Sequence, residues 1–179
     1  MSFRAGPRCG TVTGVANRLG RRARHTLLVL HYVSSVGWLG GGLCQLTLNV
    51  VALATGDPVL RHAAHEIAHV FDISVLALLA LGSAATGILL AWRGRWGLLR
   101  YRWIVVKLVL TGVLIVYTPV WVGGWVGEAI SATAHGPGGA GYPAVRTELT
   151  ASSVGIVTTL VLVTVISVVK PWGRTRRVR

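Results

Sequence analysis

The chain has 179 residues, of which 53% are hydrophobic, yet its formal net charge is +13. This combination leaves two main classes for the chain, a membrane protein or a nucleic-acid-binding protein. Basic residues form three clusters (4–24, 93–102 and 170–179), which lack the interleaved aromatic residues that read bases, so we expect no nucleic-acid partner.

The chain opens with a basic segment, residues 1–25, that is rich in Gly and Arg. Four apolar stretches follow at about 27–54, 69–91, 103–125 and 149–169, each long enough to cross a hydrocarbon core of about 30 Å as a helix. Open strands are excluded, because their backbone groups would go unpaired in lipid. The sequence therefore predicts an all-α membrane protein, with a four-transmembrane-helix bundle at 26–170 and a basic tail at 171–179.

The basic residues also predict orientation, because segments rich in Arg and Lys stay on the cytoplasmic side. The N-terminal segment, the 92–102 loop and the C-terminal tail hold most of them, whereas the other two loops hold only Arg61 and Arg146. The acidic residues fall on or near the opposite side: Asp57, Glu66, Asp72, Glu128 and Glu148. We predict a multi-pass protein of the cell (plasma) membrane with both termini in the cytoplasm.

The two external connections have different patterns. The 55–68 connection begins with the turn signal Gly56-Asp57-Pro58 and continues as a polar amphipathic run. The 126–148 connection contains the string HGPGGAGYP, whose Gly and Pro content predicts irregular structure.

Small residues recur within the apolar stretches. Gly37 and Gly41 have G-x-x-x-G spacing, and Ser83 and Gly87 are the small-xxx-small equivalent. Such positions let helices approach closely in lipid, so we interpret them as packing positions of a compact bundle. A homo-oligomer, or a larger membrane partner, stays an open alternative.

Polar residues inside the helices are candidates for function, because polar groups are costly in hydrocarbon. On the first helix they form one stripe that faces the bundle interior: His31, Ser34, Trp38, Gln45 and Asn49. His31 is either a ring satisfied by a neighbouring helix or a haem ligand. Lys107, near the inner end of the third helix, either reaches the cytoplasmic interface or pairs with a haem propionate or an anionic substrate.

At the outer end of the second helix, the spacing of His and Asp residues predicts a metal site. His62, His65, His69 and Asp72 recur at intervals of three, four and three, which places them on one helical face. The string HEIAH at 65–69 also matches H-E-x-x-H, the zinc-binding pattern of metallopeptidases. The alternatives are a bound copper or zinc ion, a peptidase, and a solvated polar entrance to the helix.

These residues lie at two levels. His31 and Lys107 are about one turn inside the cytoplasmic boundary, whereas His65, His69 and Asp72 are expected at the external boundary. At about 1.5 Å of rise per residue, the levels are roughly 20 Å or more apart. One haem iron therefore cannot be ligated by both His31 and His69, which excludes the simplest four-helix cytochrome.

Two strings resemble the small bacterial membrane families around HemJ, a protoporphyrinogen oxidase, and CopD, a copper-resistance protein. They are LLVLHYVSSVGWLGGGL at 27–43 and RYRWIVVKLVLTGVLIVY at 100–117, with TGILLA at 86–91 before the second. The shared features map onto His31, onto Trp38 with the glycines at 40–42, and onto Trp103 with Lys107. The resemblance implies a b-haem ligand at His31, with Trp38 beside the cofactor and Lys107 as a nearby functional cation.

Three functions follow as alternatives. The first is a small b-haem redox protein that acts on a lipophilic substrate. The second is an external copper- or zinc-handling membrane protein that uses the second-helix histidines. The third is a non-catalytic accessory or scaffold subunit, in which the polar stripe serves helix packing.

Overall fold

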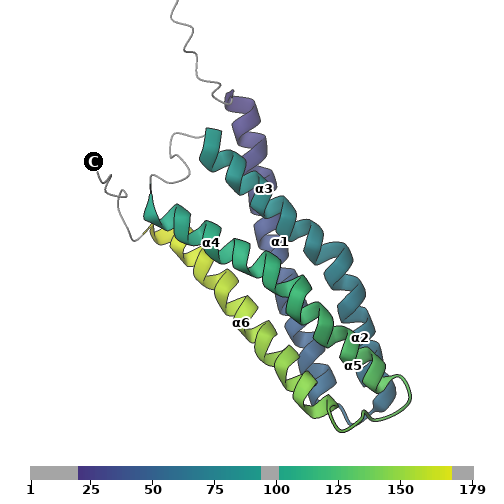
Figure 1. The fold of residues 1–179 in the computed structure, drawn as a ribbon. Helices are drawn as coiled ribbons and strands as arrows, with labels where there is room; N and C mark the ends of the chain where they lie inside the picture. Colours follow the sequence, from purple (N-terminus) through teal and green to yellow (C-terminus); the bar gives the residue numbers. More distant parts are fainter. Residues whose placement is uncertain (1–19, 94–100, 171–179) are drawn as a thin grey trace, which may run out of the picture.

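The computed structural model describes residues 20–93 and 101–170 (Figure 1). Within these ranges it contains four helical spans that are long and apolar enough to cross a membrane. They are α1 (Arg21–Ala54); α2 (Pro58–Phe71), η1 (Asp72–Leu76) and α3 (Ala77–Arg93); α4 (Arg102–Tyr117), η2 (Thr118–Val122) and α5 (Gly123–Thr133); and α6 (Tyr142–Val169). The predicted all-α, four-span architecture is confirmed. The predicted basic tail, and the N-terminal segment as far as residue 19, lie outside the described residues.

The four spans run alternately up and down, with consecutive spans antiparallel (Figure 1). We call the end with Arg21, Arg93, Arg102 and Lys170 the proximal end, and the end with the 55–57 and 134–141 connections the distal end. Helix α1 packs against α3, α6 and α2, and α4 packs against α6 and α3. Toward the proximal end the α1–α3 pair diverges from the α4–α6 pair (Figure 1).

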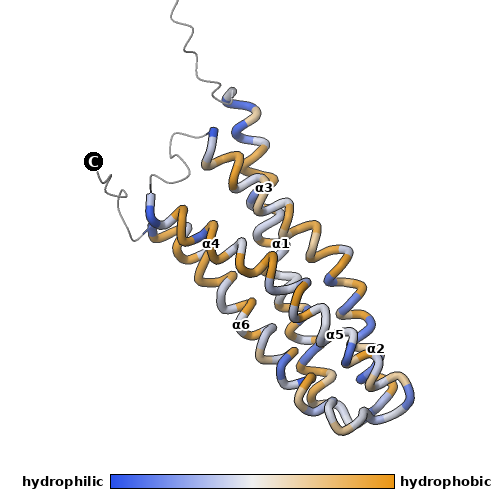
Figure 2. Tube along the Cα trace, viewed as in Figure 1, coloured by the Kyte–Doolittle hydropathy of each residue, from blue (hydrophilic) through white to orange (hydrophobic). Residues whose placement is uncertain are grey.

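At the distal end, the second, third and fourth helical spans extend beyond the apolar stretches from which they were predicted. The second begins at Pro58 rather than near residue 69, because Asp57 accepts a hydrogen bond from the Val59 amide at 2.9 Å and Pro58 occupies the first turn. The third continues to Thr133 and the fourth begins at Tyr142, so the irregular part of the predicted 126–148 loop shrinks to 134–141. Hydropathy marks only the part of a helix that suits lipid, and Figure 2 shows hydrophilic residues near both ends of the bundle.

Two short π-helical segments interrupt the second and third spans. Segment η1 begins at Asp72 and η2 begins at Thr118. A π turn places an extra residue in the helix, which rotates the following residues and often marks a functional site. Pro119 explains the second segment, because proline lacks the N–H that an α-helix would use at that position.

Small residues set the contact between α1 and the second span. A Cβ on Gly41 would lie 2.5 Å from Leu76 Cδ2, and one on Gly37 would lie 3.2 Å from Leu79. In the other direction, a Cβ on Gly87 would lie 3.0 Å from Cε1 of His31. The glycines of each helix therefore make room for larger side chains of the facing helix, as predicted for small-residue packing positions.

The buried apolar residues form two clusters. One contains Trp38, Leu76, Ala80, Leu114 and Leu160, and the other, at the distal end, contains Val122, Val126, Ala129, Tyr142 and Leu149. Many large apolar side chains on the outer faces are exposed, which suits a lipid bilayer around the helices.

Candidate functional site

His31 lies half-buried on α1 and turns toward α3. Its Nδ1 lies 3.0 Å from the backbone oxygen of Ser83 and 3.1 Å from Oγ1 of Thr86. A carbonyl oxygen can only accept a hydrogen bond, so Nδ1 carries the hydrogen. Thr86 donates its own hydroxyl to the Gly82 oxygen at 2.6 Å, which leaves its lone pairs for His31.

This arrangement determines the state of the other ring nitrogen. When Nδ1 of a neutral imidazole carries the hydrogen, Nε2 carries the lone pair. Within residues 20–93 and 101–170, no hydrogen bond reaches Nε2 of His31. The ring is thus fixed in one tautomer, with the lone pair on Nε2.

Two glycines of α3 make the space for this face of α1. A Cβ on Gly87 would lie 3.0 Å from the His31 ring, and one on Gly82 would lie 3.0 Å from Oγ of Ser34. The glycines that matter for the position of His31 are therefore on the facing helix. The neighbouring glycines of its own helix, Gly41 and Gly42, contact other elements.

Lys107 and Trp38, the other two residues expected beside a haem, are placed differently. Lys107 of α4 lies within electrostatic range of the His31 ring. Trp38 is buried farther along α1, where it lines a separate cavity. The structure therefore brings His31 and Lys107 near each other and assigns Trp38 to another site.

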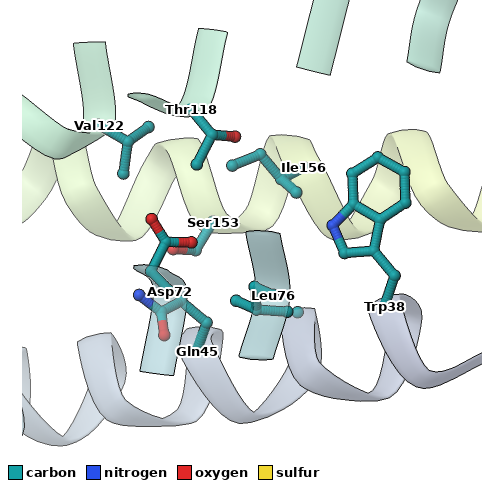
Figure 3. A pocket seen from close by; sticks show the side chains of 9 residues that line it. Trp38, Gln45, Asp72, Leu76, Thr118, Val122, Ser153 and Ile156 are labelled. Carbon is teal, nitrogen blue, oxygen red and sulfur yellow. The ribbon is translucent and has the colours of Figure 1, made fainter. Parts of the chain in front are cut away.

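That cavity lies between the two apolar clusters and has a volume of about 30 Å³. Figure 3 shows side chains from all four spans around it. The lining residues are Trp38, Gly42, Gln45, Asp72, Leu76, Thr118, Val122, Ser153 and Ile156. The first and last residues of both π segments are among them, so η1 and η2 meet at this cavity. We call it the mid-bundle cavity.

Asp72 is the main departure from the sequence-based placement. It was expected at the external boundary with the histidines, but the second span begins so early that the 14 residues of α2 precede it. At about 1.5 Å per residue this is roughly 20 Å of helix. Asp72 consequently lies inside the bundle beside Gln45 rather than at its distal end (Figure 3).

The histidines of α2 also have separate partners. His62 Nδ1 lies 2.9 Å from Oγ1 of Thr133, and its Nε2 lies 3.5 Å from Glu66. His65 is fully buried, with Nε2 hydrogen-bonded to the Tyr142 hydroxyl at 2.9 Å.

In the described part of the chain, no three His, Cys, Asp or Glu side chains are placed to hold a metal ion together. The structure therefore does not gather the predicted set of His62, His65, His69 and Asp72 into one site. The four share a helical face, but His62 and Asp72 are roughly 15 Å apart along it, too far to share an ion.

The sequence did not single out the partners of two polar side chains in the interior, Asn49 and His65. Asn49 Nδ2 donates to Oγ of Ser153 at 2.7 Å, which links α1 to α6. Tyr142, the partner of His65, lies under the guanidinium groups of Arg61 and Arg146 at 5.8 and 5.9 Å from its ring centroid. Pro119, next to Thr118 in an otherwise apolar run, was the available signal for η2.

Comparisons with protein-family models, with curated proteins and with solved structures find no match to this chain. Its function is therefore argued from its own residues.

Proposed function

We propose that this chain is a small membrane redox protein that holds a b-type haem through Nε2 of His31. One observation carries the proposal, namely the hydrogen bond from Nδ1 of His31 to the Ser83 oxygen. Ligating histidines almost always donate their other ring N–H to a carbonyl, a carboxylate or water, which fixes the ring and raises the basicity of the ligating nitrogen. The resemblance of residues 27–43 and 100–117 to the HemJ and CopD families supports the same assignment.

One further feature of the surroundings of His31 suits a haem. Lys107 supplies a positive charge at the level of the ring, where it would pair with a propionate. When bound, the haem would supply one-electron transfer, and the chain's part is to hold and orient it.

The reaction partner in this proposal is lipophilic. His31 belongs to a membrane-spanning helix and is half-buried, so a partner would reach it through the hydrocarbon rather than through water. We therefore propose that the haem would exchange electrons with a lipid-soluble substrate.

The proposal is tested first on the purified wild-type protein. Full-length chain from haem-replete cells should show a Soret band and a stoichiometric amount of haem b by pyridine haemochrome. A colourless preparation with native helix content would overturn the proposed function and leave the accessory-subunit alternative.

We also propose that the protein lies in the plasma membrane with its proximal end, and thus both termini, in the cytoplasm. Of the described basic residues, Arg21, Arg22, Arg24, Arg93, Arg102 and Lys170 are at the proximal end. At the distal end Arg61 donates to the backbone oxygens of Pro137 and Thr55. A green fluorescent protein fused after residue 179 should fluoresce, because it folds in the cytoplasm, and a dark fusion at normal protein levels would contradict the orientation.

A further inference from the structure

Two arginines from different spans lie against one buried ring at the distal end of the bundle. The guanidinium carbons of Arg61 in α2 and Arg146 in α6 are 5.8 and 5.9 Å from the ring centroid of Tyr142. Tyr142 is only 3% exposed, and its hydroxyl is hydrogen-bonded to Nε2 of His65 at 2.9 Å, so the ring is held in place. Two positive charges are therefore positioned beside the same rigid side chain.

Neither positive charge is neutralised by a carboxylate of the chain. All five acidic residues of the sequence lie within the described ranges, where the one salt bridge pairs Glu66 with His62. Arg61 and Arg146 are also close to the N-terminal ends of α2 and α6, and the helix dipole disfavours a cation at that end. A bound anion would offset both unfavourable terms.

The guanidinium of Arg146 presents free donors. The residue is half-buried, and its Nε is buried without a hydrogen-bond partner. Its two terminal nitrogens are not buried, and within residues 20–93 and 101–170 no hydrogen bond engages them. The planar fork of a guanidinium matches the spacing of two oxygens of a phosphate or a carboxylate. The outer end of Arg146 is therefore a donor pair that an anion can reach.

Arg61 supplies the second charge from a fixed position. One terminal nitrogen donates to the Pro137 oxygen at 3.0 Å, and the other donates to the Thr55 oxygen at 2.6 Å. Both acceptors are neutral carbonyls, so they orient the guanidinium without cancelling its charge. These bonds also tie the 55–57 connection to the 134–141 connection. Because the side chain is already ordered, a ligand would lose little affinity to the entropy of fixing it.

We infer that Arg61 and Arg146 bind one phosphate group at the distal end of the bundle. A phosphate group offers several oxygens and a full negative charge to the two guanidinium groups. The pair lies near the ends of two spans that are apolar enough to cross a membrane, which is where lipid phosphates are concentrated. The headgroup of an anionic phospholipid and free inorganic phosphate are the two sources of such a group. The site does not depend on His31 or on haem.

The test measures the Tm of the full-length protein in detergent against rising concentrations of three probes. Dioleoylphosphatidylglycerol carries a phosphate and lipid chains, and dioleoylglycerol carries the chains alone. Inorganic phosphate, compared with chloride at equal ionic strength, supplies the phosphate alone. Arg146→Gln is the test variant, and Arg24→Gln, an exposed residue of α1 at the proximal end, is the control with the same change of charge. Arg146→Lys, which keeps the charge and loses the fork, serves in case Arg146→Gln does not fold.

Two results support the inference and distinguish the sources. A Tm that rises with the logarithm of phosphatidylglycerol concentration, and not with dioleoylglycerol, identifies a lipid phosphate, whereas a rise with inorganic phosphate identifies the free anion. Arg146→Gln should raise the concentration needed for a given shift by about tenfold or more, because it removes charged hydrogen bonds, and Arg146→Lys should raise it less. Arg24→Gln should behave as the wild type.

Three results would overturn the inference. One is a wild-type Tm that responds to neither phosphate probe. Another is an equal response to phosphatidylglycerol and dioleoylglycerol without a response to inorganic phosphate, because the lipid chains would then account for it. The third is a phosphate response that persists in full in the folded Arg146 variants.

Discussion

His31→Ala should abolish haem retention while leaving the helix content of the protein unchanged. Alanine removes the only nitrogen that the proposal assigns to the iron, whereas the loss of a half-buried ring on one helix leaves the two apolar clusters intact. The Soret band and the haemochrome should both disappear from the purified variant, with far-UV circular dichroism as in the wild type.

His25→Ala is the matched control for this experiment. His25 lies on the same helix, nearer the proximal end, and is exposed, so its loss should leave the haem in place. A His31→Ala protein that keeps the wild-type Soret band would show that His31 is not the ligand, even if the protein does bind haem.

Gly41→Val is expected to have the largest effect on stability. A Cβ at this position would lie 2.5 Å from Leu76 Cδ2 and 3.5 Å from Phe71 Cε1. Leu76 is only 6% exposed within the Trp38 cluster, so it has little room to move aside. Overpacking of this kind typically costs about 1–3 kcal/mol, and valine adds two methyl groups beyond the Cβ. The change should lower the free energy of unfolding measured by titration with a denaturing detergent.

Gly40→Val is the control that separates the steric clash at Gly41 from the general effect of replacing a helical glycine with valine. Gly40 is the preceding residue of α1 and is exposed, and a Cβ at this position would meet no atom within 4 Å. Its replacement should alter stability by well under half of the Gly41 effect. Equal losses from the two variants would mean that the contact between α1 and η1 does not limit packing.

Much of the architecture could be predicted from the sequence, because the physical signals are strong and local. Long apolar stretches are incompatible with a water-soluble fold, and the stripe from His31 to Asn49 follows the helical repeat. The structure buries Trp38, Gln45 and Asn49 of that stripe, in agreement with the prediction.

The interior sites were less predictable, because one helical face meets several neighbours along its length. His62 contacts α5, His65 contacts α6, and Asp72 faces α1 across the mid-bundle cavity. Spacing along α2 shows that these side chains point the same way, but which helix they meet depends on the tertiary arrangement. The π segments add to the difficulty, because each rotates the residues that follow it.

The partners of His31 illustrate the same limit. Its depth and its proximity to Lys107 were predicted from span boundaries, whereas the Ser83 oxygen that fixes its tautomer belongs to the backbone of α3. A backbone carbonyl that will accept a hydrogen bond cannot be recognised from the residue type, because every residue carries one. Gly87 was noted as a packing residue, but only the structure shows that it makes room for the imidazole ring.

The central claim, that Nε2 of His31 is the haem ligand, is tested most directly by resonance Raman spectroscopy of the reduced protein. We expect an iron–imidazole stretching band that is present in wild type and His25→Ala and absent from His31→Ala. Thr86→Val should shift this band, because it removes one acceptor of the Nδ1 hydrogen while the ligand stays in place. An iron–imidazole band that survives His31→Ala, or a haem-containing wild type without one, would contradict the claim.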